Sequence, residues 1–310
     1  MKICYTSDLH GNLVLYQQLL HLIIEENVEA LLLGGDQCPS KSGSGAIEYQ
    51  KHWLLTSFRE FLQLIQYRCQ VYWTSGNHDL AGTLNIIKDF ERANLIIQCN
   101  LRKSFLCEGW AVIGFPFLPI NDGWPYKDWE RLDVNQTLKF KDKRSIYITQ
   151  NGRLEQIQLN EWLQSSQDIE SLLNEMLGIT LSNKTVLVSH CPPFKSGLDE
   201  NAFHKSIGTK ALLNFLLNAK ITLACHGHVH EAPYITHKWI QTINSTVCIN
   251  PGQWGKQLHA IIFDINDIHK SIKHTIFGKI EDGKIPYIKS KAIQKEIKQY
   301  WKTAMLSINQ

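Results

Sequence analysis

The sequence predicts an α/β protein built on a mainly parallel β-sheet. Short apolar runs of strand length alternate with longer segments in which apolar residues recur at helical spacing. Where strands and helices alternate in this way, each helix connects two parallel strands and packs on a face of the sheet. The chain has 310 residues, 44% of them hydrophobic and 20% charged, which is enough to bury a core as one large or two modest domains.

The N-terminal residues carry the clearest part of this pattern. We expect a strand over residues 2–7, a helix over 11–26, a strand over 30–33, a helix over 51–66 and a strand over 70–74. This βαβαβ series is the main support for a parallel sheet.

The pattern breaks in the middle of the chain. Short strands are expected at 95–98, 104–107 and 110–115. Residues 117–183 then carry turn signals, tryptophans and a helical run over about 159–177. We interpret residues 117–183 as an insertion or cap on the core.

Four side chains of this insertion leave two interpretations open. Trp124, Tyr126 and Trp129 could stack on a base while Arg131 pairs with a phosphate. Alternatively, all four could pack inside the cap, which is the interpretation that we favour.

The α/β pattern resumes after the insertion, with four strands and one helix. The strands are expected at 185–189, 221–225, 246–249 and 259–265, and the helix near 208–218.

The whole chain, residues 1–310, is therefore predicted to form a single domain with a core that is split in sequence. The core comprises about residues 1–116 and 184–268. Residues 269–310 add a hairpin, signalled by Glu281-Asp282-Gly283-Lys284, and a terminal amphipathic helix.

The net charge does not predict a polyanionic partner. The formal net charge is only +3, which is too small for the whole surface to attract nucleic acid. Nine lysines lie between residues 270 and 302, against Glu281, Asp282 and Glu296. This segment is either a solvated face or a local contact for a polyanion such as nucleic acid.

Cysteine usage and the N-terminus favour a cytoplasmic protein that does not associate with membranes. The eight cysteines form no CxxC pair and lie mostly in apolar runs, as buried reduced thiols do. Asp8 interrupts the N-terminus before a signal peptide's apolar region could form, and no apolar run approaches about 18 residues.

Five short polar motifs each follow an expected strand. Taken singly, each has an ordinary explanation: Asp8 or Asn12 could cap a helix, and Gly35-Asp36 could be a plain turn. Together they place carboxylate, amide and imidazole groups at strand ends, where loops can bring them together. The motifs are Asp8-Leu9-His10, Gly35-Asp36, Gly76-Asn77-His78-Asp79, Ser189-His190 and Gly227-His228-Val229-His230.

The last motif has the spacing of a paired imidazole site. In an extended segment residues i and i+2 face the same way, so His228 and His230 can point into one cavity. His226 shares this parity, but Gly227 marks the end of the strand and leaves His226 inside it as a packed residue.

Carboxylate, imidazole and amide ligands suit Mn, Fe, Zn or a similar divalent ion. Two ions roughly 3.5–4 Å apart need a shared carboxylate. Asp36 is the natural bridge, because it lies between the two ligand groups along the chain.

The five motifs in this order resemble the calcineurin-like metallophosphoesterases, whose blocks are DxH, GD, GNHD or GNHE, xH and GHxH. The resemblance spans about residues 8–230. It implies a four-layer αββα sandwich, in which two mixed sheets pack face to face with helices outside.

The resemblance also implies a role for each motif residue. One metal would be held by Asp8, His10, Asp36 and His230, and the other by Asp36, Asn77, His190 and His228. His78 would be a catalytic residue close to the phosphate without binding a metal.

The sequence departs from one branch of this family. In the protein Ser/Thr phosphatases the GD block continues as GDxxDRG, whereas the residues after Asp36 include neither the second Asp nor the Arg. Asp79 could take over as the catalytic group that orients His78. A salt bridge or a cap explains Asp79 equally well.

The expected activity is hydrolysis of a phosphoester by in-line attack of a hydroxide that bridges two divalent metal ions. The substrate would be a small-molecule or nucleotide phosphomonoester or phosphodiester. Two alternatives remain: a nucleic-acid-processing phosphodiesterase that uses the lysine-rich C-terminal segment, and a non-catalytic binding or scaffold protein. The sequence does not indicate the oligomeric state.

Overall fold

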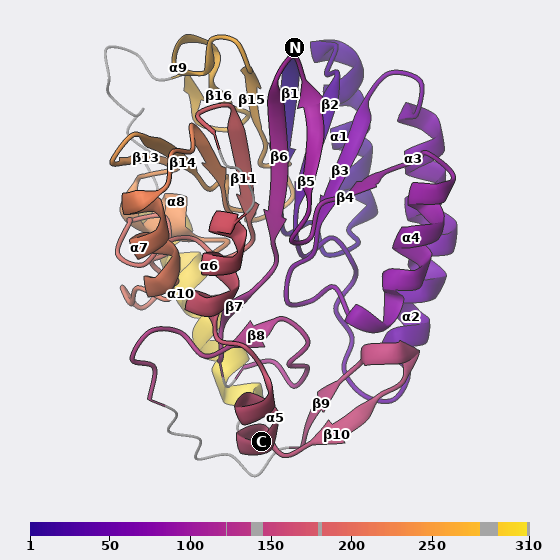
Figure 1. Cartoon of the computed structure of the whole chain (residues 1–310), viewed down its shortest axis with the longest axis vertical. Coiled ribbons are helices and arrows are strands. Elements are labelled where there is room, and N and C mark those ends of the chain that lie inside the picture. The colour runs from indigo at the N-terminus through magenta and orange to yellow at the C-terminus, as the bar shows by residue number, and fades with distance from the viewer. Residues whose placement is uncertain (122, 138–144, 179–181, 280–290, 309–310) are drawn as a thin grey trace.

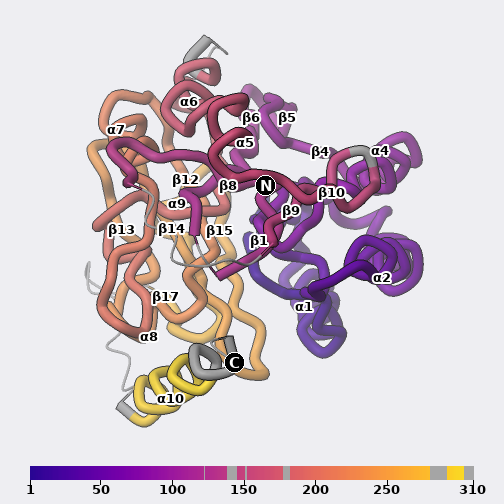
Figure 2. Tube along the Cα trace, turned by 90° about the horizontal axis from the view of Figure 1, so that it is seen from below, coloured from indigo at the N-terminus to yellow at the C-terminus, as the bar shows by residue number. Residues whose placement is uncertain are grey.

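Two mixed β-sheets pack face to face, with helices on both outer faces (Figure 1). The computed structural model describes residues 1–121, 123–137, 145–178, 182–279 and 291–308. Figure 2 shows helices α1, α2 and α4 on one side of the sheets and α6 and α7 on the other. The predicted four-layer αββα arrangement is therefore confirmed.

The first sheet has the order β17-β16-β15-β1-β2-β3-β4 in the described residues. Strands β1 to β4 are parallel to one another, as the βαβαβ pattern predicted, while β15, β16 and β17 add antiparallel pairs, including β15 with β1. The strands are β1 (Lys2–Thr6), β2 (Ala30–Gly34), β3 (Gln70–Thr74), β4 (Ile97–Gln98), β15 (Ile261–Asp264), β16 (Lys273–His274) and β17 (Gly278–Lys279).

The second sheet has the order β13-β14-β12-β11-β6-β5 in the described residues. Its centre, from β6 through β11 and β12 to β14, is parallel, and β5 and β13 are antiparallel edges. The strands are β5 (Lys103–Cys107), β6 (Trp110–Phe115), β11 (Thr185–Ser189), β12 (Leu223–Cys225), β13 (Ile240–Ile243) and β14 (Thr246–Ile249).

Alternation along the strands divides the core into layers. Ile3 and Tyr5 of β1 face the second sheet, whereas Cys4 faces the helices, because successive side chains point to opposite faces. The helices over the first sheet are α1 (Leu13–Glu26), α2 (Ala46–Trp53), α3 (Arg59–Ile65) and α4 (Leu84–Arg92), and those over the second are α6 (Ile169–Gly178) and α7 (Lys210–Asn218).

Two helix predictions need correction. The run expected at 159–177 forms two helices, α5 (Leu159–Ser165) and α6, because Ser166 is extended and the Asp168 carboxylate accepts the N–H of Ser171 at 2.7 Å. The helix expected at 51–66 begins earlier, with α2, and passes through a π-helical turn at Leu54–Phe58 before α3.

Most of the remaining elements lie in the segment interpreted as a cap or after residue 231, and one 3₁₀ turn directly precedes α4. The division of the domain into core and cap stays a prediction, and the hairpin expected at residues 281–284 lies outside the described residues. Within the part of the chain that is described, no helix is both long enough and apolar enough to cross a bilayer. The elements are β7 (Leu118–Pro119), β8 (Glu130–Arg131), β9 (Ile146–Ile148), β10 (Glu155–Ile157), α8 (Ala232–Thr236), α9 (Ile268–Ser271), α10 (Lys291–Ile308) and the 3₁₀ turns Ala81–Thr83 and Gln150–Gly152.

Candidate metal centre

The five motifs meet where the carboxyl ends of strands from both sheets come together. Strands β1, β2 and β3 of the first sheet are parallel, as are β11 and β12 of the second, so the loops that follow them share one end of the sandwich. Asn12 caps α1 by accepting the N–H of Val14 at 3.0 Å, which leaves Asp8 for the site. The residues brought together are Asp8, His10, Asp36, Asn77, His190, His228 and His230.

The first cluster comprises Asp8, His10, Asp36 and His230. One possible ligand atom from each lies within 4.8 Å of the others. The Nε2 atom of His230 is 3.1 Å from an Asp8 carboxylate oxygen and 3.3 Å from Nε2 of His10. These are the four residues that the resemblance assigned to one metal.

The second cluster comprises Asp36, His190 and His228, again within 4.8 Å. The side-chain oxygen of Asn77 lies 3.2 Å from Nε2 of His190 and 3.1 Å from Nδ1 of His228. Asp36 belongs to both clusters, the position expected for a shared carboxylate.

The backbone is unusual at four of these residues. Asp8, His10, Asp36 and His228 have φ values of 62°, 46°, 54° and 66°, in the left-handed region that residues other than glycine seldom adopt. Such strain concentrates at functional sites, where the surrounding structure enforces it. Gly76 lets the loops approach, because a Cβ atom there would lie 2.3 Å from an Asp36 carboxylate oxygen.

The electrostatics of the clusters favour bound positive charge. Burial alone would raise the pKa of Asp8, but the charge of His230 and its hydrogen bond outweigh burial and hold that pKa at about 2. Burial would lower the pKa of His190, but Asp36 raises it to about 9. A site that stabilises buried imidazolium groups in this way suits a divalent cation, and its oxygen and nitrogen donors fit Mn, Fe or Zn.

Neighbouring backbone groups fix the orientation of the candidate ligands. The Nδ1–H of His190 donates to the carbonyl of Gly34 at 2.9 Å, which leaves Nε2 facing Asp36. The backbone N–H of His228 donates to both Asp8 carboxylate oxygens, at 3.1 and 3.0 Å. Contacts of this kind hold metal ligands in place in other proteins.

His78 lies beside the clusters. Its backbone N–H donates to Asp36 at 2.7 Å, and its ring centroid is 4.9 Å from that of His10. The Ser40 hydroxyl lies 2.7 Å from Nδ1 of His78 and 3.1 Å from Nδ1 of His10, so it connects the two rings. Burial lowers the pKa of His78 to about 3.

The buried Asp79 side chain contacts the backbone of two loops. Its carboxylate accepts the backbone N–H groups of Cys38 at 2.8 Å and Gly76 at 3.0 Å, and so ties together the loops after β2 and β3. Burial and the nearby Asp36 raise its pKa to about 7. The group that contacts the ring nitrogen of His78 is Ser40, which the sequence analysis missed.

His226 follows β12 and is fully buried, with Nδ1 3.1 Å from the carbonyl oxygen of Ser189. It belongs to neither cluster in the described residues. Asn250, at the end of β14, donates to the carbonyls of Gly227 and Val229, both at 3.3 Å, and so supports the loop that carries His228.

The aromatic residues of the insertion hold the loop that carries His78. The Trp124 and Trp129 indoles donate to the carbonyls of Asn77 at 2.9 Å and Asp79 at 2.6 Å. The Arg131 guanidinium is buried between the rings of Phe117 and Trp162 and donates to backbone carbonyls. For Trp129 and Arg131 the geometry therefore supports packing over contact with a substrate.

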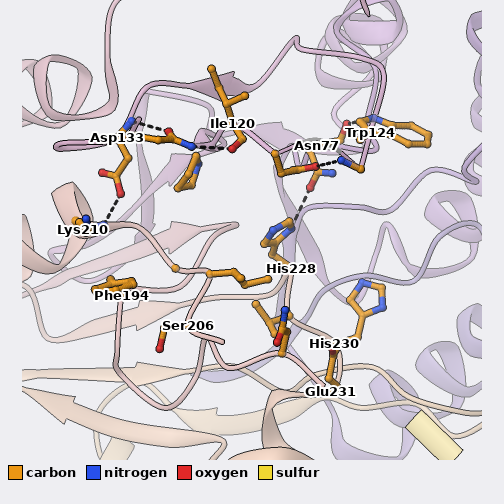
Figure 3. Close-up of a pocket in the computed structure, with 18 of the residues that line it drawn as sticks. Asn77, Ile120, Trp124, Asp133, Phe194, Ser206, Lys210, His228, His230 and Glu231 are labelled. Atoms are coloured by element: carbon orange, nitrogen blue, oxygen red, sulfur yellow. Dashed lines mark hydrogen bonds between the residues drawn. The ribbon is translucent and has the colours of Figure 1, made fainter. Parts of the chain in front are cut away.

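A cavity of about 670 Å³ opens directly onto the clusters (Figure 3). Asp36, Asn77, His78, His228 and His230 are among the residues that line it. A molecule bound there would have one end among the candidate metal ligands.

Comparisons with known proteins support the fold and identify the family. One crystal structure is 14% identical in sequence, with 88% of this chain and 97% of that chain covered and a TM-score of 0.61. The crystal structure of TT1561 of Thermus thermophilus is 11% identical, with 88% and 97% covered and a TM-score of 0.52. No curated protein matches the sequence significantly. The model of the calcineurin-like phosphoesterase family matches residues 1–232, which include all five motifs, and the chain belongs to this family.

Proposed function

We propose that this protein hydrolyses phosphoesters with two divalent metal ions, held by Asp8, His10, Asp36, Asn77, His190, His228 and His230. The observation that carries the proposal is the pair of clusters that share Asp36, with His78 at their edge. Members of its family use a dinuclear metal centre. Manganese, iron and zinc all fit the donor atoms.

The chemistry divides between the ions and the protein. When bound, the two cations lower the pKa of a water and neutralise phosphoryl oxygens. The water oxygen bonds to phosphorus as the bond to the leaving oxygen breaks, and the leaving oxygen takes up a proton. His78, whose pKa of about 3 keeps its ring neutral, is placed to donate a hydrogen bond from its ring N–H to the leaving oxygen, and Ser40 and Trp124 fix its ring. Asp79 positions the loop by accepting the backbone N–H groups of Cys38 and Gly76.

The two alternatives receive less support. Among the described lysines of the C-terminal segment, Lys270 and Lys273 pair with Asp267 and Glu26, so they are already engaged. A scaffold protein has no need to keep seven candidate ligands together, four of them with a strained backbone. A cytoplasmic location stays a prediction.

A substrate screen tests the proposal. We expect turnover of p-nitrophenyl phosphate, its bis-ester or a nucleotide analogue with manganese, iron, zinc or magnesium. Faster hydrolysis of the bis-ester would favour a phosphodiesterase. If the protein binds and cleaves oligonucleotides, and if both binding and cleavage weaken steeply as the salt concentration rises, the nucleic-acid alternative would be favoured.

The His78→Ala variant separates binding from catalysis. It should retain metal and lose turnover by about 10²–10³-fold, the usual cost of removing one hydrogen-bond donor to developing negative charge. Wild-type turnover in this variant would remove His78 from the mechanism. Failure of the wild-type protein to hydrolyse any of these esters would revive the scaffold interpretation.

A further inference from the structure

Beyond the candidate metal ligands, the cavity beside the clusters is lined largely by apolar side chains. Resting on the function proposed above, we propose that it binds a large apolar group esterified to the substrate's phosphate. The substrate would then be a phosphoester of a bulky hydrophobic alcohol, with an aliphatic or aryl group, and nucleotides would be poor substrates.

Apolar side chains form most of the wall beyond the candidate metal ligands. Ile207 is 38% exposed although it is apolar. Figure 3 shows Phe194 on one side of the cavity and Trp124 on the other. Burying apolar surface against such walls is favourable, and no directed polar contact is needed. The apolar lining residues are Pro119, Ile120, Trp124, Val134, Phe194, Phe203, Ile207, Val229 and Trp301.

Polar residues also line the cavity, but the protein already uses many of their polar atoms. Both carboxylate oxygens of Asp133 accept backbone N–H groups at the start of α7, at 2.7 and 2.9 Å. Gln136 accepts from the Asp133 N–H at 3.1 Å and donates to the carbonyl of Ile120 at 2.7 Å.

The same holds for Asn201 and Glu231, two other residues of the lining. The Asn201 side-chain oxygen accepts the N–H groups of Phe203 and Lys205 at 3.0 and 3.1 Å. Glu231 accepts the N–H of Ala202 at 2.9 Å. The ammonium of Lys210 lies 5.5 Å from the centroid of the Phe194 ring.

This arrangement argues against a nucleobase. A base presents several donors and acceptors along its edge, and each one left unpaired in a buried site weakens binding. Here Asp133, Gln136 and Asn201 direct polar atoms into the protein. An alkyl or aryl group has no donors or acceptors that would need a partner in the cavity.

The size of the cavity points to a bulky group. A volume of about 670 Å³ lies well within the range of roughly 300–1,000 Å³ typical of sites for drug-sized ligands. Trp301 of α10 lines the cavity, so the C-terminal helix contributes to its wall. A methyl or ethyl ester would leave most of this space unfilled.

A series of n-alkylphosphonates from butyl to octyl tests the inference, with AMP as the nucleotide competitor. Inhibition is measured against whichever nitrophenyl ester the protein hydrolyses, and binding is measured separately by tryptophan fluorescence, since Trp124 and Trp301 line the cavity. Each buried methylene strengthens binding up to about fourfold. Octylphosphonate should therefore bind at least tenfold more tightly than butylphosphonate, and more tightly than AMP.

Two variants and a control locate the effect. In Ile207→Asn and in Phe194→Ala, the ratio of the affinity for octylphosphonate to the affinity for butylphosphonate should move towards one. Phe105→Ala should leave this ratio as in the wild type, because Phe105 is 72% exposed on β5 and does not line the cavity.

Equal binding of butyl- and octylphosphonate, or tighter binding of AMP, would overturn the inference while leaving phosphoester hydrolysis intact. Absence of any hydrolysis would instead defeat the proposed function, and the fluorescence titration would still report on the cavity.

Discussion

The indole ring of Trp124 lies against the imidazole of His78, with the ring centroids 3.9 Å apart and an angle of 34° between the planes. The indole N–H donates to the carbonyl of Asn77 at 2.9 Å. Two residues far apart in sequence thus form one unit, in which the insertion fixes the loop that carries a candidate ligand and the candidate catalytic imidazole.

Replacing Trp124 should impair turnover more than metal binding. Trp124→Ala removes both the ring contact and the hydrogen bond, so we expect kcat to fall about tenfold, equivalent to ~1.4 kcal/mol in the barrier. Metal content should stay as in the wild type, and Trp124→Phe, which keeps a ring, should recover part of the loss. Steady-state kinetics and metal analysis check this, and an unaltered kcat in Trp124→Ala would show that the contact does not matter.

Ser40 should act through the orientation of His78. Its hydroxyl contacts Nδ1 of both His78 and His10, and the residue is exposed, so its loss should hardly affect folding. A lost hydrogen bond is worth about 0.5–1.5 kcal/mol, so Ser40→Ala should lower kcat by roughly 2- to 13-fold with a smaller change in KM. Ser40→Thr should restore kcat. If threonine fails to rescue the activity while metal binding is intact, the hydroxyl is not the relevant feature.

A buried ion pair supports the segment that carries Trp124. The Lys127 ammonium lies 2.8 Å from Glu130, and the two side chains are 1% and 0% exposed. Lys127→Met would remove the ammonium group that contacts the buried Glu130 carboxylate and should cost about 3–5 kcal/mol of unfolding free energy. Urea denaturation measures the change in the free energy of unfolding. The control is Arg92→Met, which breaks the exposed Arg92–Asp89 pair and should change this free energy by about 1 kcal/mol or less. A similar small effect at Lys127 would refute the role given to the pair.

The candidate ligands could be predicted from the sequence because each belongs to a short motif directly after a strand. Local pattern was sufficient for Asp36 and for the His228 and His230 pair. The contacts of Ser40 and Trp124 could not be predicted, since they depend on how separate loops meet in space. For Trp124 the sequence left open stacking on a base and packing inside the cap, and it gave no indication of the contact with His78.

Helix boundaries show the same division between local and long-range information. Apolar spacing continued through residues 159–177, but Asp168 caps a second helix there and the N–H of Ile169 donates to the carbonyl of Leu132 at 2.9 Å. Asp133 likewise caps α7 from far away in sequence. Hydrophobic periodicity in the sequence does not predict tertiary contacts of this kind.

Stability should fall in mild acid because of the buried His259. Burial lowers its pKa to about 4, whereas an unfolded histidine has a pKa of about 6.5. Between these values the unfolded chain binds more protons, so this group lowers stability as the pH falls below about 6.5, by about 2 kcal/mol at pH 5. His259→Gln should reduce the loss between pH 7.5 and 5 in urea unfolding, whereas His21→Gln, at an exposed site, should not. Identical pH profiles for wild type and His259→Gln would contradict this account.

Equilibrium dialysis against manganese, followed by metal analysis, tests the shared carboxylate most directly. Because Asp36 belongs to both clusters, the wild-type chain should bind two ions and Asp36→Asn should bind neither at the same concentration, with activity lost in parallel. Asp89→Asn, at an exposed carboxylate outside both clusters, should still bind two. A wild-type chain that takes up no divalent ion, or an Asp36→Asn variant that keeps two, would contradict the dinuclear centre.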